Sequence, residues 1–291
     1  PVSANSVSVT AAITNTGNPK ASQHGVCWNT TGDPTIANSK TQEGAVTQPG
    51  NSISSVTGLN PNTTYHARAY ITNDYGTNYG RTVSFITSAF PSGTGTSEDP
   101  FLISSLAHLF WMASDTTRWD KHYKQISDID VTPTQNWNEG EGWIPVGNNI
   151  VPFSGNYNGS GYAIGSLFIN RENSDRMGLF GSLDQAVISN MRLISVNIIG
   201  RSYVSALAGE MNFSEISNSI FSGDLSSNNI SAANSYVGFI AGRSNNSNII
   251  NCYAVGSLST NCEYVGGLVG YSFGTTISSS YTVGNINGRS L

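Results

Sequence analysis

The fold prediction rests on a repeated segment, Tyr264-Val265-Gly266-Gly267-Leu268-Val269-Gly270. It recurs at residues 236–242 and 203–209, with a degenerate copy at 177–181. Each copy is followed by two further short apolar runs, so one repeat predicts three short strands. Three such strands cannot bury a core alone, whereas stacked repeats can, with like strands pairing about 4.8 Å apart. The repeat predicts a parallel β-helix or related β-solenoid; the alternative is a β-propeller, whose blades usually run ~40 residues.

The spacing between copies predicts the register in which the strands stack. From Tyr236 to Tyr264 is 28 residues, and from Tyr203 to Tyr236 is 33. The five additional residues fall between Leu225 and Tyr236, so we expect them to lengthen one loop and to leave the strands in register. The same spacing places the next repeat tyrosine just beyond Leu291, so we expect the native protein to continue and the repeat region to be truncated here.

One row of side chains tests this register. Glu210, Arg243 and Tyr271 each follow the last glycine of a copy, so in a stack of parallel coils they should lie one above another. We expect a Glu210–Arg243 ion pair, worth about 0–1 kcal/mol if exposed. The Tyr271 ring should lie on the other side of the guanidinium.

A region of different composition precedes the repeats. Residues 91–97 form a Gly/Ser/Thr stretch without apolar periodicity, which indicates a linker. Apolar residues at helical spacing over 106–113, with Ser104 or Ser105 as N-cap, predict a short helix. We expect this helix and its neighbouring tryptophans to cover the open end of the β-stack.

Two groups of side chains in this capping region are candidate sites. Trp137 and Trp143 flank the polar turn 138–142, and their flat faces are candidates for stacking on sugar rings; the alternative is that they also cap the stack. Oxygen ligands for Ca²⁺ are available from four carboxylates, Asp128, Asp130, Glu139 and Glu141. Their spacing is not that of an EF-hand loop, so solvated turn carboxylates are the alternative and we predict no metal.

The first 88 residues alternate apolar and polar side chains over short runs that turn residues separate. Strands are predicted at residues 6–13, 23–29, 52–56, 65–72 and 81–87. Short strands with turn signals about every ten residues predict an antiparallel sandwich.

The segment Gly58-Leu59-Asn60-Pro61-Asn62-Thr63-Thr64-Tyr65 resembles the corner before strand F of fibronectin type III domains, through Leu59, Pro61 and Tyr65. The resemblance implies that the Tyr65 hydroxyl bonds to backbone near Leu59. Gly25-Val26-Cys27-Trp28 is also similar to fibronectin-type modules common in proteins of the Bacteroidetes. We expect the first strand of this domain to be clipped at Pro1. Such modules act mostly as spacers, and ligand binding is the alternative.

The repeats resemble GLUG motifs, named for the Gly-Leu-x-Gly core that is seen here as Gly267-Leu268-Val269-Gly270. The lead-in Trp143-Ile144-Pro145-Val146-Gly147 is similar to the sequence that precedes such repeats, and the resemblance spans about residues 95–291. Repeats of this kind occur in bacterial surface adhesins and in large secreted proteins, including some peptidases. The resemblance therefore implies a secreted or cell-surface location and an unknown protein or glycan partner.

Composition and motif content argue against several classes of function. Charged residues make up 11% and the net charge is -5 without a basic run, which argues against nucleic acid. No apolar stretch approaches the ~20 residues that span a bilayer. Three cysteines are too few for a disulfide scaffold, and Cys27, in an apolar run, is expected to be a buried free thiol. No zinc-peptidase, nucleophile-elbow or P-loop motif is present.

Together these patterns predict an all-β protein. A fibronectin type III-like antiparallel sandwich spans 1–88, a linker 89–97, the cap and first coils of a β-solenoid 98–174, and GLUG-like repeats 175–291. The predicted function is a non-catalytic, secreted or cell-surface, adhesin-like protein without cofactors. The first alternative is a carbohydrate-binding module of an extracellular polysaccharide-processing system. The second alternative is a polysaccharide lyase or hydrolase, because parallel β-helices often host those enzymes.

Overall fold

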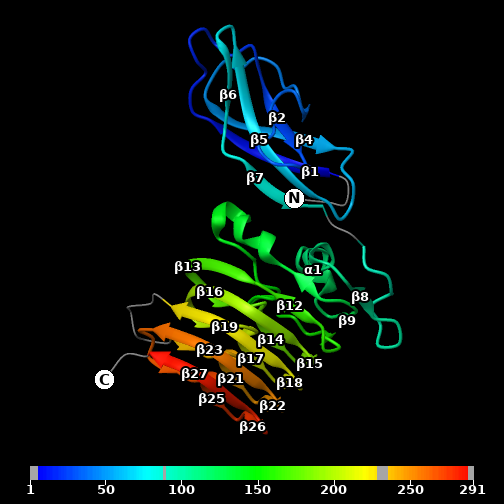
Figure 1. The fold of residues 1–291 in the computed structure, drawn as a ribbon, viewed down its shortest axis with the longest axis vertical. Coiled ribbons are helices and arrows are strands. Elements are labelled where there is room, and N and C mark those ends of the chain that lie inside the picture. Colours follow the sequence, from blue (N-terminus) through cyan, green and yellow to red (C-terminus); the bar gives the residue numbers. More distant parts are fainter. Residues whose placement is uncertain (1–5, 88–89, 228–234, 288–291) are drawn as a thin grey trace. The chain divides into compact units, whose positions relative to one another are not determined.

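The computed structural model describes residues 6–87, 90–227 and 235–287. The chain divides into two compact units, Pro1–Phe90 and Pro91–Leu291 (Figure 1). Both units consist mainly of β-strands, and α1 (Leu106–Ala113) is the single α-helix in the described part. The prediction of an all-β chain is thus confirmed. The expected start of the linker at 88–89 lies outside the described residues, as do both chain ends.

The first unit contains two antiparallel sheets. One pairs β1 (Ser6–Ile13) with β4 (Gly50–Thr57). The other has the order β3 (Ser39–Lys40), β2 (Gln23–Asn29), β5 (Thr64–Asn73), β6 (Gly76–Tyr79), and β7 (Val83–Ile86) also pairs with β5. The apolar alternation predicted both β1 and β2 with the bounds that the structure has.

Side chains from both sheets share the core of this unit. Val7 and Val56 from the first sheet pack with Val26, Tyr65 and Ala67 from the second. Buried Val7 and Val56 have more exposed neighbours along β1 and β4, because successive side chains of a strand point to opposite faces. Burial of this apolar surface stabilises the unit by roughly 1.5–3 kcal/mol for each large side chain.

The second unit begins with a cap of short elements. Helix α1 starts at Ser105, whose side chain accepts a hydrogen bond from the His108 backbone N–H at 3.3 Å, as the N-cap prediction requires. The other elements are β8 (Phe101–Ile103), three 3-10 helices (Thr116–Arg118, Thr132–Asn136 and Asn138–Gly140), β9 (His122–Gln125) and β10 (Ile129–Asp130). Leu106, Leu109 and Met112 bury one side of α1.

Three sheets follow, and in the repeats their strands pair in parallel (Figure 1). The first sheet contains β8, β9, β11 (Asn156–Asn158), β15 (Val187–Ser189), β18 (Glu215–Ser217), β22 (Asn248–Ile250) and β26 (Thr276–Ser278). The second contains β14 (Phe180–Asp184), β17 (Ala208–Asn212), β21 (Ala241–Asn245) and β25 (Val269–Phe273). The third contains β10, β12 (Ala163–Gly165), β13 (Phe168–Met177), β16 (Arg192–Val204), β19 (Ile220–Ser227), β20 (Tyr236–Val237), β23 (Tyr253–Thr260), β24 (Tyr264–Val265) and β27 (Tyr281–Asn287).

Equivalent residues of successive repeats pair with one another. Ile188 pairs with Ile216, and Ile216 with Ile249, and all three are fully buried. The offset between partners is 28 residues for Ile188–Ile216, 33 from Val204–Val237 to Ser227–Thr260, and 28 again from Tyr236–Tyr264 onward. The five additional residues therefore lie between Ser227 and Tyr236, as predicted, and the loop 228–234 itself lies outside the described residues.

A row of glycines marks where neighbouring coils approach most closely. Gly223 pairs with Gly256, and Gly256 with Gly284, with φ of +140°, +153° and +150°. A Cβ atom added at Gly256 would overlap the carbonyl oxygen of Gly223. Only a residue without a Cβ fits both the backbone angle and the space.

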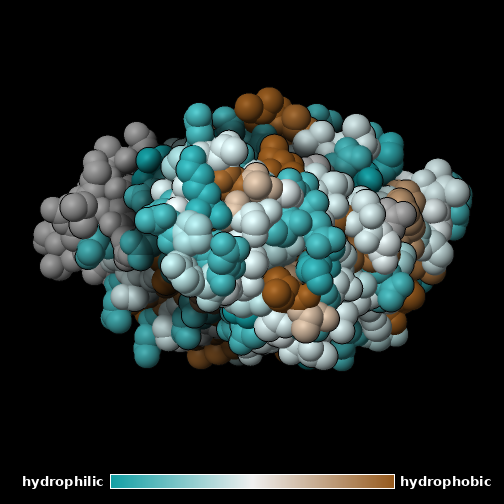
Figure 2. All heavy atoms as spheres, turned by 90° about the horizontal axis from the view of Figure 1, so that it is seen from above, coloured by the Kyte–Doolittle hydropathy of each residue, from teal (hydrophilic) through white to brown (hydrophobic). Residues whose placement is uncertain are grey.

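The surface of the molecule contains both polar and apolar residues. On the face shown in Figure 2, hydrophobic side chains form separate groups within a mostly polar surface.

All three cysteines are buried free thiols, which confirms the prediction for Cys27. Burial raises the pKa of Cys27 and of Cys252, so both thiols are held in the protonated, less reactive form.

Candidate functional site

The two tryptophans predicted as a sugar platform are buried. Trp137 is 7% exposed and Trp143 is 1% exposed. Their rings stack on each other, with centroids 6.1 Å apart, and the Trp143 indole N–H donates to the Leu179 carbonyl at 3.2 Å. Because a sugar ring needs an open aromatic face, these covered rings match the capping alternative instead. Trp111 and Trp119, predicted to cap, are buried as well.

Three of the four candidate Ca²⁺ carboxylates bind other partners within the chain. Asp128 accepts a hydrogen bond from the Ala163 N–H at 2.7 Å. Asp130 accepts from the hydroxyl and backbone N–H of Thr132, and these bonds lower the pKa of Asp130. Glu141 pairs with Arg171 at 2.6 Å, and Glu139 stands at a turn with φ 59°. Across the residues that the structure describes, no three His, Cys, Asp or Glu side chains group as a metal site.

The expected hydrogen bond between the Tyr65 hydroxyl and backbone near Leu59 is present. The Tyr65 hydroxyl accepts a hydrogen bond from the Asn60 backbone N–H at 3.1 Å, one residue past Leu59. Leu59 is 4% exposed, and Pro61 precedes the turn that leads into β5. This contact closes the loop between β4 and β5.

The predicted ladder is present across β17, β21 and β25. Glu210 pairs in register with Arg243, and Arg243 with Tyr271. The Glu210 Oε1 lies 3.6 Å from Arg243 Nη1, and the Arg243 guanidinium lies 5.9 Å from the centre of the Tyr271 ring. The repeat alignment that predicts this order is therefore correct. Gly267, Leu268 and Gly270 of the Gly-Leu-x-Gly core lie beside it, where Ile240 N–H donates to the Leu268 carbonyl at 2.8 Å.

A second arginine extends this ladder. Arg176 Nε donates to the other carboxylate oxygen of Glu210 at 3.1 Å, and its guanidinium lies 4.8 Å from the Tyr203 ring centre. Glu210 is thus held between two guanidinium groups, with its side chain 11% exposed. Repeat spacing does not predict the contact of Arg176, because the copy at 177–181 lacks the repeat tyrosine.

The repeat tyrosines form their own row. Tyr203, Tyr236 and Tyr264 follow one another with ring centres 4.8 and 5.1 Å apart. Tyr271 approaches Tyr236 and Tyr264 at 5.6 and 5.4 Å. Burial raises the pKa of Tyr236, so the row acts as neutral packing between coils.

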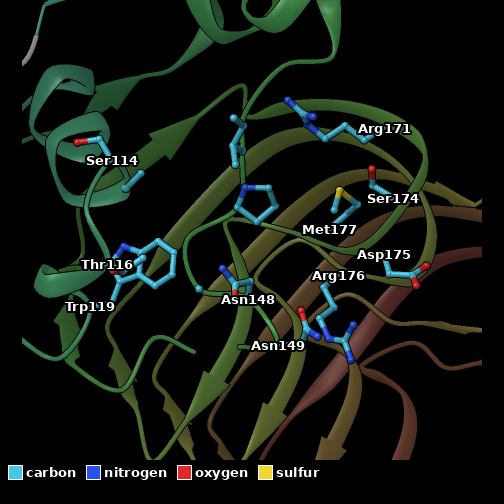
Figure 3. Close-up of a pocket in the computed structure, with 14 residues that line it drawn as sticks. Ser114, Thr116, Trp119, Asn148, Asn149, Arg171, Ser174, Asp175, Arg176 and Met177 are labelled. Atoms are coloured by element: carbon cyan, nitrogen blue, oxygen red, sulfur yellow. The ribbon is translucent and has the colours of Figure 1, made fainter. Parts of the chain in front are cut away.

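Next to the ladder lies the groove of Figure 3, with a volume of about 510 Å³. The loop 144–149 forms one side, and β13 supplies Arg171, Asp175 and Arg176 on the other. A bulge interrupts β13 between Arg171 and Asp175, and Arg176 has a left-handed φ of 63°. Bulges and left-handed residues redirect side chains and are frequent next to binding sites.

A second hollow of about 410 Å³ continues from this groove. Asn148, Asn149 and Arg176 line both hollows, and the second also reaches Asp184, Glu210, Asn212 and Phe213. Asn148 Oδ1 accepts hydrogen bonds from the N–H groups of Ile150 and Val151 at 2.8 and 2.9 Å, which folds the loop into a turn. Figure 3 shows Asn149 beside the Arg176 guanidinium.

The carboxylates of the groove differ in how they are paired. Asp175 accepts two hydrogen bonds from Arg201, at 2.8 and 2.6 Å, and both oxygens of Glu210 face arginines. Asp184 forms no side-chain hydrogen bond with the described residues. The groove therefore offers fixed donors and acceptors on a rigid sheet, an arrangement suited to binding a polar ligand.

No protein-family model matches the chain. Over 131 residues, 43% of this chain, it is 36% identical to Halomucin of Haloquadratum walsbyi, and the match covers 1% of that protein. Over 111 residues, 36% of this chain, it is 38% identical to a putative Gly-rich membrane protein of Evansella cellulosilytica, covering 12% of it. The chain thus spans a small part of the length of each relative. No helix in the described residues is long and apolar enough to cross a membrane.

Proposed function

We propose that this protein is a non-catalytic, adhesin-like component of a cell surface. In this proposal a fibronectin type III-like sandwich over residues 1–88 is a spacer. A β-solenoid, with its cap and first coils over 98–174 and GLUG-like repeats over 175–291, presents the binding surface. The observation that carries the proposal is the stacking of equivalent side chains in register, as in the Glu210–Arg243–Tyr271 row. Such stacking repeats a surface from coil to coil, which suits binding to extended partners.

Several observations support the individual parts. Parallel pairing of like strands favours a solenoid over a propeller, whose blades are antiparallel sheets arranged around a channel. The Tyr65–Asn60 hydrogen bond supports the fibronectin-like corner. The similarity to Halomucin and to a putative membrane protein supports location at the surface.

A carbohydrate-binding module is the second candidate, and the groove next to the ladder favours it. Its arginines and most of its carboxylates are held in ion pairs. Hydrolysis by a carboxylate pair needs both carboxylates free to act as acid and as base or nucleophile. Among the described carboxylates that line the two hollows only Asp184 is outside an ion pair, so the groove is better suited to binding without turnover.

Labelling of intact cells tests the surface location. An antibody against the whole chain should label intact cells of the source organism, and brief external protease treatment should remove the label. Label that is seen only after lysis would refute the proposal. A parallel assay for new reducing ends or unsaturated sugars on a polysaccharide panel should give no product, and turnover by the purified chain would refute the non-catalytic part.

A further inference from the structure

We propose that the hollow between Phe213, Arg176 and Asp184 binds a neutral glycan, with one sugar ring stacked on Phe213. The inference rests on the proposed function, because it supplies the ligand class for a surface-binding protein. It starts from an aromatic residue that the folding of the chain does not explain. Phe213 is 63% exposed and lines the hollow.

Phe213 stands at a turn where the chain favours other residues. The pairs Asp184–Asn212 and Asn212–Asn245 make Gln185, Phe213 and Asn246 equivalent, and Gly274 follows in the next coil. All four have left-handed φ, between 45° and 62°. Gly and Asn accept this conformation readily, whereas a bulky aromatic residue there is an outlier.

The cost of this phenylalanine is therefore twofold. Its backbone is strained by about 1 kcal/mol or more relative to Gly or Asn, and its ring is left in water. Strained residues of this kind concentrate at ligand sites, where the side chain is needed in one position. A flat, exposed ring at the edge of a polar hollow suits the apolar face of a pyranose ring.

The polar groups around the ring match hydroxyl groups. Arg176 uses its Nε for Glu210, and an arginine carries five N–H donors, so donors remain for a ligand. The exposed Asn149 amide lies beside it (Figure 3) and forms no side-chain hydrogen bond within the described part of the chain. Asp184 on the same hollow supplies an acceptor. A sugar hydroxyl donates and accepts at once, so it can bridge such a donor and acceptor.

Charge argues for a neutral ligand. The two hollows together contain Arg171 and Arg176 against Asp175, Asp184 and Glu210. Ion pairs with Glu141 and Arg201 further compensate these charges. A polyanionic glycan or an acidic peptide would meet carboxylates on the wall of the hollow without a surplus of arginine to offset them.

The test compares two exposed phenylalanines, each replaced by the residue found at its equivalent position. Phe213→Asn installs the residue type of Asn246, which tolerates the left-handed turn, so the variant should fold at least as stably as the parent. Phe273→Asn installs the residue type of Asn245, and Phe273 is similarly exposed, at 61%, but does not line the groove. Both variants are made in the full chain, with thermal unfolding as the check on folding.

Binding is measured by calorimetry and on an array of short neutral hexose and pentose oligosaccharides, with uronic-acid and sulfated oligosaccharides of matched length. We expect a neutral oligosaccharide to bind the parent and the Phe273→Asn variant equally. Phe213→Asn should weaken that binding at least tenfold, and Asp184→Asn severalfold. Binding of acidic glycans alone, equal binding by Phe213→Asn, or no binding to the array would overturn the inference. Adhesion of chain-coated beads to cells that survives Phe213→Asn would overturn it while leaving the proposed surface function intact.

Discussion

Replacing Gly256 by alanine probes the close approach of neighbouring coils. The added Cβ would overlap the Gly223 carbonyl oxygen, and φ at this position is +153°. Forcing a residue other than glycine into such a conformation costs about 1–2 kcal/mol, and overpacking a close-packed interior costs a further 1–3 kcal/mol or so. We therefore expect Gly256→Ala to lower the free energy of unfolding by about 2–5 kcal/mol.

The matched control is Gly161→Ala. Gly161 also has a positive φ, +80°, but a Cβ added there meets nothing within 4 Å. The free energy of unfolding of the control should therefore fall only by the cost of the left-handed backbone conformation, about 1–2 kcal/mol. The difference between the two variants isolates the contact between coils.

Calorimetric unfolding of the full chain is the assay. A unit of about 200 residues changes its Tm by roughly 2–4 °C for each kcal/mol, so Gly256→Ala should lower the Tm of the second unit by about 4–20 °C. The Tm of the Gly161→Ala variant should lie well above that of the Gly256→Ala variant. A Tm for Gly256→Ala equal to or higher than that of the control would show that the contact between Gly256 and Gly223 leaves room for a Cβ atom.

Three further predictions concern single hydrogen bonds. The Ser104 N–H donates to His108 Nδ1 at 3.2 Å, and burial lowers the pKa of His108. Because the unfolded chain then binds the proton more readily than the folded chain, stability should fall as the pH drops below about 6.5. The Tm measured from pH 7.5 to 5 should therefore change less for His108→Asn than for the parent. Tyr65→Phe leaves the Asn60 N–H without its acceptor and should cost about 1–3 kcal/mol, read from the midpoint of urea unfolding; an unchanged midpoint would contradict the corner. Ser105→Ala removes the N-cap of α1 and should cost about 0.5–2 kcal/mol by thermal unfolding, whereas an effect below about 0.3 kcal/mol would mean that the cap is dispensable.

Apolar alternation predicted some strands well and missed others. β1 has the predicted bounds because its apolar side chains are more buried than the polar ones between them. β2 instead buries the consecutive residues Gly25, Val26 and Cys27, and the turn residues that follow Asn29 indicate its end. The short strands β3 and β6 escaped prediction because Ser39–Lys40 and Gly76–Tyr79 carry no apolar alternation. Hydrogen bonds to β2 and β5 hold them in place, and such tertiary pairing leaves no local signal.

The candidate site was predictable only where the repeat reaches it. Equivalent positions place Glu210 beside Arg243 from spacing alone, and the structure agrees. The contact with Arg176 depends on a degenerate copy and on the bulge in β13, which spacing does not reveal. Phe213 carried a usable signal, since aligned repeats show Asn and Gly where this coil has an aromatic residue.

The direction of the hydrogen bonds between coils has a mechanical consequence. In all three sheets of the second unit the strands pair from coil to coil, so their backbone hydrogen bonds run along the stacking direction. A tensile force along that direction loads the bonds of one coil at a time, as in a zipper, and coils should detach in successive small steps at low force. The antiparallel strands of the first unit, when pulled along their length, share the load in shear across many bonds at once. When each unit is pulled separately in its own direction, the stacked unit should extend at lower force than the first unit and should absorb work gradually.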